Sequence, residues 1–85
     1  MHIKVHTALN TGTSVSINDT ARVLVRQGFN PSDSAQVDRI KAIAAALISE
    51  CEAIREKNAN SARHASLAIT SAEEAAMWAV KAATT

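Results

Sequence analysis

Apolar side chains recur at intervals of three and four residues along two alanine-rich stretches, and this periodicity predicts two long amphipathic helices. The first helix is predicted to begin near Ala35 and end at about Lys57, and the second to extend from Ser61 to Ala83. The apolar positions of the first helix are Val37, Ile40, Ala44, Leu47, Cys51 and Ile54, with Ile43 and Ile48 beside them. Those of the second helix are Ala62, Ala65, Ile69, Ala72, Ala76, Ala79 and Ala83. The polar link 58–60 is short, which predicts an antiparallel helical hairpin.

Residues 1–28 follow a different pattern. Ile3 and Val5 alternate with polar residues, and so do Val15 and Ile17. Alternation of this kind fits either a short β-hairpin or an extended arm.

The stretch 18–27 suits a short helix or a strand, and we favour the helix. Asn18 or Asp19 would cap its start, and Gly28 would end it at the C′ position after Arg26. The chain is therefore predicted to be all-α, with an N-terminal arm of residues 1–28 (a short strand or helix) before a helical hairpin domain of residues 29–85.

A chain of 85 residues makes one small domain, and a two-helix hairpin is too thin to bury its own apolar surface. We therefore expect a homo-oligomer. The net charge of +1 provides no basic field for DNA or RNA. The N-terminus lacks an apolar signal segment and no stretch reaches the ~20 apolar residues of a membrane span, so we expect a cytosolic protein without membrane contact.

Neither a disulfide nor a metal or other cofactor is expected, because the chain has one cysteine and three histidines without ligand spacing. Cys51 lies on the apolar stripe, where a small core residue is favoured over a reactive thiol. The carboxylates form no acid and base pair, and no nucleophile or phosphate-loop motif is present. We therefore expect a protein that is not an enzyme.

Arg63, Ser66 and Thr70 share one face near the start of the second helix, where a guanidinium, two hydroxyls and the helix dipole suit a phosphate. Spacing alone favours the alternative, a solvated arginine beside two hydroxyls that a helix tolerates. Arg39 and Lys41 are cations near the start of the first helix, where the dipole disfavours them, and they serve either a ligand or ordinary surface pairing.

Phe29, with Asn30 beside it, stands between a glycine and a proline turn. Its ring is either a plug over the hairpin core or a platform on which a base stacks. The sequence favours the plug.

Several of these segments together resemble a known family. They are Phe29-Asn-Pro-Ser, Val37-Asp-Arg-Ile-Lys41, Ala45-Ala-Leu-Ile48, Arg63 with Thr70, and Met77-Trp-Ala-Val-Lys81. Over residues 29–83 the pattern resembles the helical hairpin shared by phage anti-CBASS cyclic-nucleotide sponges and the C-terminal part of anti-Thoeris sponges.

The resemblance implies an all-helical protomer that assembles into a hexamer and captures cyclic oligonucleotides in the infected bacterial cell without cleaving them. It implies that Lys41, with an aromatic residue, holds cyclic dinucleotides between paired protomers. It also implies that Arg63, with Thr70 beside it, holds cyclic trinucleotides where protomers converge. The family's tyrosine has no counterpart near Arg26, so Phe29 is the substitute aromatic.

Three alternatives remain open. The chain could bind cyclic ADP-ribose signals of Thoeris, although it lacks the longer N-terminal β-domain of those sponges. It could also be a structural helical oligomer or adaptor without a nucleotide ligand. An enzyme acting on cyclic nucleotides is the least favoured reading.

Overall fold

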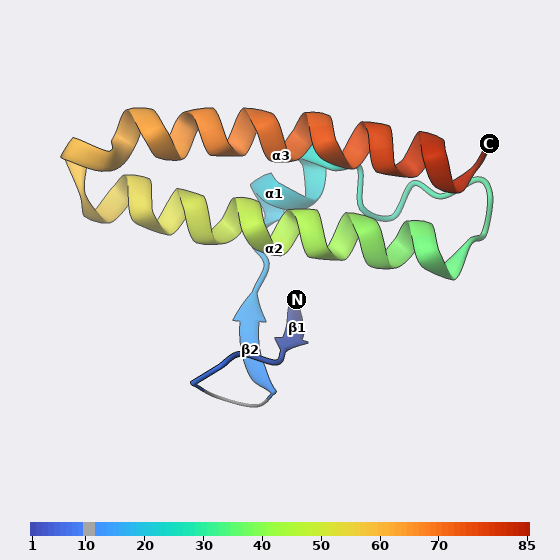
Figure 1. The fold of residues 1–85 in the computed structure, drawn as a ribbon, viewed down its shortest axis with the longest axis horizontal. Helices are drawn as coiled ribbons and strands as arrows, with labels where there is room; N and C mark the ends of the chain where they lie inside the picture. The colour runs from blue at the N-terminus through green and yellow to red at the C-terminus, as the bar shows by residue number, and fades with distance from the viewer. Residues whose placement is uncertain (10–11) are drawn as a thin grey trace.

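Two long antiparallel helices dominate the computed structural model, which describes residues 1–9 and 12–85 (Figure 1). Helix α2 spans Ala35–Lys57 and helix α3 spans Ala62–Ala83, joined by the short 3-10 helix η1, Ala59–Ser61. The predicted hairpin and its helix ends are therefore confirmed. Ser34 caps α2, because its hydroxyl accepts a hydrogen bond from the Val37 amide at 3.3 Å.

A two-stranded antiparallel sheet precedes the helices. Strand β1 spans His2–Val5 and strand β2 spans Thr13–Ser16, with Ile3 opposite Val15. The sheet projects away from the helical pair on the side of α2 (Figure 1). The all-α prediction is wrong on this point, whereas the β-hairpin alternative for this segment is confirmed. Residues 10 and 11, which belong to the predicted arm, lie outside the described residues.

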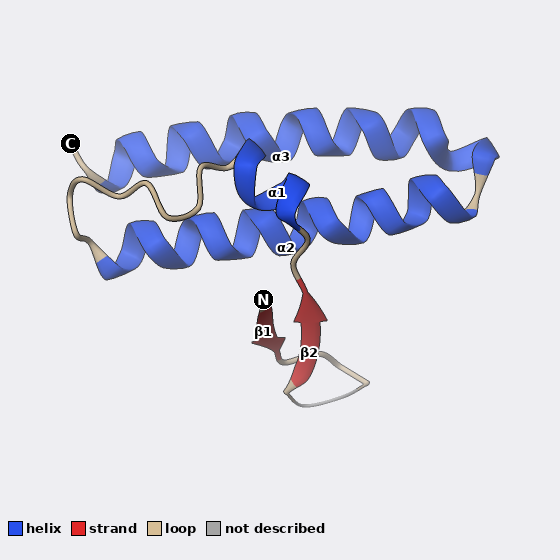
Figure 2. Cartoon of the chain, turned by 180° about the vertical axis from the view of Figure 1, so that it is seen from behind, coloured by secondary structure: helices blue, strands red, loops and turns tan. Residues whose placement is uncertain are grey.

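The short helix α1 spans Asp19–Leu24 and lies across the two long helices (Figure 2). Asn18 caps it by accepting a hydrogen bond from the Ala21 amide at 2.8 Å. The helix ends earlier than predicted. Val25 is its C-cap, and Arg26 rather than Gly28 occupies the C′ position.

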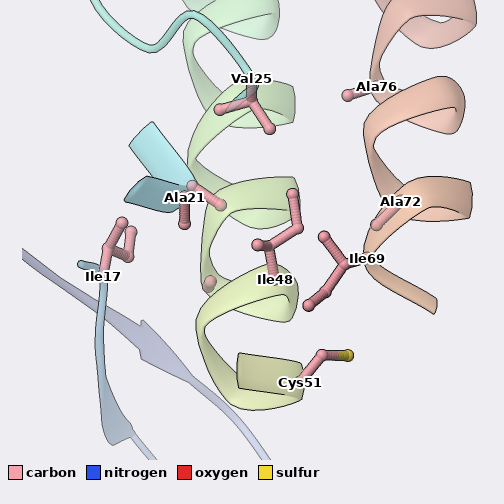
Figure 3. Packing of buried hydrophobic residues seen from close by; sticks show 10 residues of the cluster. Ile17, Ala21, Val25, Ile48, Cys51, Ile69, Ala72 and Ala76 are labelled. Carbon is pink, nitrogen blue, oxygen red and sulfur yellow. The ribbon is translucent and has the colours of Figure 1, made fainter. Parts of the chain in front are cut away.

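The core forms where α1 covers the helical hairpin. Ile48 is fully buried and lies in the middle of this cluster, with Ala21 of α1 on one side and Ile69 of α3 on the other (Figure 3). Cys51 is 7% exposed, which confirms it as a core residue. The small side chains of α3 allow a close helix approach.

The predicted apolar stripe of α3 is confirmed, and that of α2 is only partly correct. Leu47 and Ile54 remain 52% and 49% exposed, whereas Ala45 and Ile48 are fully buried. The core face of α2 is rotated from the predicted stripe because α1 packs against a second side of this helix.

Candidate ligand-binding cavity

The cavity is built around Lys41, a buried cation on α2. Its side chain is only 6% exposed. The ammonium donates hydrogen bonds to the backbone carbonyls of Arg26, at 3.0 Å, and of Phe29. These two acceptors lie in the turn between α1 and α2, so Lys41 fastens that turn to the helical hairpin.

The turn has a regular hydrogen-bonding pattern. The amide of Arg26 donates to the Val23 carbonyl at 3.1 Å, and the amide of Gln27 donates to the Arg22 carbonyl at 2.9 Å. This pair of bonds is a Schellman motif, which requires a left-handed residue at C′. Arg26 fills that position with φ 54°, although a side chain is disfavoured there.

Phe29 lies beside two cations. Its ring centroid is 5.4 Å from the Lys41 ammonium and 6.0 Å from the guanidinium carbon of Arg26, both within cation–π range. The side chain is 59% exposed. The prediction that Phe29 plugs the core is therefore wrong, because the turn holds its ring at the surface.

These three residues line a cavity of about 460 Å³. Its lining also includes Glu73 and Met77 of α3. With one carboxylate and two cations, the cavity wall carries a net positive charge. Its size and its mixture of apolar and charged groups suit a small anionic ligand.

Lys41 has no carboxylate partner in the part of the chain that the structure describes. The single ion pair found there joins Arg22 to Asp19, at 3.8 Å on the surface. A buried charge is normally paired, because burial removes its hydration. Two carbonyl dipoles provide part of that compensation and leave the positive charge of Lys41 unneutralised.

Asn30 and Arg39 have different surroundings from the cavity residues. The Asn30 amide donates to the Ser34 carbonyl at 2.8 Å, and its oxygen accepts from the Ser32 hydroxyl at 2.6 Å. Asn30 therefore shapes the loop before α2. Arg39 is exposed, and two residues turn an α-helix by about 200°, so it lies on a different side of α2 from Lys41.

The second set of predicted residues lies near the other end of the hairpin. Along α2, the stretch from Lys41 to Lys57 covers roughly 24 Å, so Arg63 is remote from the cavity of its own chain. Arg63 is exposed, and Thr70 donates to the Ser66 carbonyl at 3.2 Å. The Ser66 hydroxyl accepts a hydrogen bond from Arg55 at 3.3 Å.

Sequence reasoning missed several residues around these sites. Arg26, Glu73 and Met77 line the cavity, and Arg55 reaches the face of Ser66. Arg26 could have been found from its position three residues before Phe29. No sequence pattern marked Glu73 or Met77 as cavity residues, because only the pairing of α2 with α3 brings them near Lys41.

An apolar groove runs along the surface between α2 and α3. It is lined by Ile40, Ile43, Ala44, Leu47, Ala72, Ala75, Ala76 and Ala79. Ile43 is 63% exposed, so much of this lining remains open to solvent. We refer to this surface as the alanine groove.

Neither a metal-binding cluster nor a membrane-spanning helix is found among the described residues. Within 1–9 and 12–85, no three His, Cys, Asp or Glu side chains are grouped so that they could hold a metal ion. No helix in the same ranges combines the length and the apolar character needed to cross a membrane.

The fold and the cavity together define a helical-hairpin protein with a cationic, aromatic-lined cavity. A family model described as "Acb2/Tad1, hairpin domain" matches residues 19–84. The chain belongs to this family, whose members are phage sponge proteins that bind signalling molecules, and the resemblance seen in the sequence is confirmed. Comparisons with curated proteins and with solved structures found no match.

Proposed function

We propose that this protein binds and sequesters cyclic di- and trinucleotide second messengers of CBASS signalling in the infected bacterial cell. One observation carries the proposal: the ammonium of Lys41 is buried without a carboxylate partner in a cavity that also exposes an aromatic ring. A phosphate would neutralise that charge, and Phe29 would stack on a base.

The chemistry of the ligand fits a nearly neutral chain. A cyclic dinucleotide carries two phosphates and a cyclic trinucleotide carries three, in one compact ring. A symmetric assembly presents the same cation once from each subunit, so a few placed charges are enough. Family membership supports a signalling nucleotide as the ligand.

The alanine groove supports assembly with further copies of this chain. Large apolar side chains such as Ile43 and Leu47 stand open to solvent along α2. Both also line a second groove, between α2 and the sheet. We propose that neighbouring protomers cover these surfaces in a homohexamer and complete the cavity that contains Lys41.

A second type of site is proposed at Arg63, Ser66 and Thr70. This face lies near the start of α3, whose dipole favours anions. Arg55 adds a second guanidinium to the face through its bond to Ser66. Where protomers converge, copies of Arg63 would surround a cyclic trinucleotide.

The proposed action is storage without turnover. Neither site combines a nucleophile with a positioned acid and base, so we infer that the ligand leaves chemically unchanged.

Calorimetry of the full chain with cyclic di-AMP and with cyclic triadenylate tests this function. Linear diadenylate is the control ligand, and cyclic ADP-ribose tests a Thoeris signal instead. Phe29→Ala should weaken the dinucleotide alone, and Arg63→Ala the trinucleotide alone. Lys57→Met, at the exposed end of α2, is the matched control and should bind both normally.

Chromatography of the incubated mixtures should return each nucleotide intact, and native mass spectrometry should count six protomers. Absence of binding heat together with an unchanged melting temperature at saturating cyclic nucleotide would rule out the sponge function. Binding of cyclic ADP-ribose alone would replace CBASS with Thoeris as the target.

A further inference from the structure

We infer that Trp78 and Lys81 on α3, which we call the tryptophan patch, dock into the groove between α2 and the sheet of a second copy of this chain. The contact specifies one interface of the proposed assembly and in that sense rests on the proposed function, although it requires no nucleotide. Neither residue lines the cavity that contains Lys41.

The groove between α2 and the sheet is large and apolar, and we call it the sheet groove. It has a volume of about 690 Å³. Lys4 lies on its sheet wall and Glu50 on its α2 wall. The groove therefore has room for a large apolar side chain, with a cation on one side and an anion on the other. Its apolar lining consists of Ile3, Val5 and Val15 on the sheet and Ile43, Ala46 and Leu47 on α2.

The tryptophan patch is the largest aromatic surface of the chain. Trp78 is the only tryptophan, and its side chain is 59% exposed although it is apolar over most of its area. The Lys81 ammonium lies 5.4 Å from the centroid of the ring, within cation–π range. Burial of an aromatic side chain removes about 150–250 Å² of surface from water, which favours a contact that covers Trp78.

The patch of one protomer cannot fill the groove of the same protomer. Trp78 follows the buried Ile69 by nine residues, which turn an α-helix by about 900°, or two and a half turns. Trp78 therefore lies on the side of α3 opposite to Ile69, which packs near Ile48 of α2 (Figure 3). The sheet lies on the α2 side of the helical hairpin and α3 on the other (Figure 1). The patch can thus reach only the groove of another molecule.

The charges of the two surfaces are complementary. Neither Lys81 nor Glu50 forms an ion pair within the ranges 1–9 and 12–85. An indole ring inserted among the apolar side chains of the groove, with its ammonium toward α2, would pair Lys81 with Glu50. The same orientation keeps Lys81 away from Lys4 on the opposite wall. Charge pairs of this kind fix the register of an interface and disfavour the reversed arrangement.

The contact joins two different surfaces, so it is heterologous. Each copy offers its sheet groove to one neighbour and its tryptophan patch to another. A contact of this type repeats from copy to copy and closes into a ring where the rotation between copies permits. It therefore supplies a physical basis for an assembly of several subunits.

The first test uses the unmodified protein. The chain has one tryptophan and no tyrosine, so its fluorescence reports on Trp78 alone. As dilute protein is concentrated and assembles, the emission maximum should shift to shorter wavelength, and quenching by acrylamide should fall by about half or more. A tryptophan that remains equally quenchable in the assembled protein would overturn the inference.

A charge exchange tests the pairing of Lys81 with Glu50. Lys81→Glu and Glu50→Lys should each raise the protein concentration at which Trp78 becomes shielded by about tenfold, because like charges then face each other. The double variant Lys81→Glu/Glu50→Lys should return to within about threefold of the wild type. Lys57→Glu makes the same charge change at the exposed end of α2 and should have no effect. Losses that persist in the double variant would reject the pairing.

A mixing experiment tests the direction of the contact. Glu50→Lys has a defective groove and an intact patch, whereas Trp78→Ala has an intact groove and no tryptophan. Trp78 in Glu50→Lys alone should be accessible to acrylamide, and addition of Trp78→Ala should shield it, because the second chain supplies an intact groove. An accessible tryptophan after mixing would reject a contact between two different surfaces.

These outcomes are separable from nucleotide binding. A wild-type protein that binds no cyclic nucleotide but shields Trp78 on assembly would defeat the sponge function and retain the contact. A wild-type protein that assembles and binds cyclic di-AMP while Trp78 stays fully accessible would defeat the contact alone.

Discussion

Two isoleucines of α2 give a direct test of the packing and of the proposed assembly. Ile48 is fully buried beneath α1, whereas Ile43 is 63% exposed on the alanine groove. Ile48→Ala removes three buried carbon atoms, worth about 0.8 kcal/mol each, and leaves a cavity among neighbours that are mostly alanine. We therefore expect a loss of roughly 3–4 kcal/mol in the free energy of unfolding, within the usual range for this change.

A loss of that size is large for this protein. At about 0.05–0.15 kcal/mol per residue, a chain of this length has roughly 4–13 kcal/mol of stability in total. In an isolated protomer, Ile43→Ala leaves almost no cavity, because most of this side chain is already in water. The free energy of unfolding should therefore fall by about 1 kcal/mol or less. If copies of the chain cover Ile43, the destabilisation caused by Ile43→Ala should increase with protein concentration.

Urea unfolding followed by circular dichroism, at a low and a high protein concentration, measures both effects. Ile48→Ala should be destabilised at both concentrations, and Ile43→Ala mainly at the high one. A loss below about 1 kcal/mol for Ile48→Ala would refute the core described here. Equal losses for the two variants at every concentration would refute the assignment of Ile43 to a contact between protomers.

Three further predictions follow from single contacts. Ser34→Ala removes the cap of α2 and should lower the free energy of unfolding in urea by about 1 kcal/mol. The control Ser71→Ala, at an exposed position of α3, should leave it unchanged. Equal effects of the two substitutions would contradict the cap. Arg26→Gly relieves the left-handed strain and should raise the free energy of unfolding by about 0.5–1 kcal/mol. The affinity for cyclic di-AMP should fall in the same variant. A lower free energy of unfolding would show that the strain is absent. Glu73→Gln removes the carboxylate from the cavity and should tighten cyclic di-AMP about two- to fivefold in calorimetry, with the exposed Glu74→Gln unchanged. Weaker binding in Glu73→Gln would instead show that the carboxylate accepts a hydrogen bond from the ligand.

The helical hairpin was predictable because its determinants are local. Alanine-rich periodicity, the capping Ser34 and the short polar link specify where each helix begins and ends. The burial of α3 followed as well, because this helix packs along a single stripe. For α2 the same reasoning placed Leu47 in the core in preference to Ala45, since it did not include the second contact made by α1.

The sequence by itself also determined which residues could hold an anion, since Phe29, Lys41 and Arg63 are few and distinctive in a nearly neutral chain. Only the tertiary structure decided how they are used. It buries Lys41 against the turn, exposes Phe29, adds Arg26 and brings Glu73 from the second helix into the same cavity. The physical reason is that periodicity and caps act over a few residues, whereas burial and charge pairing depend on which distant segments meet in the folded chain.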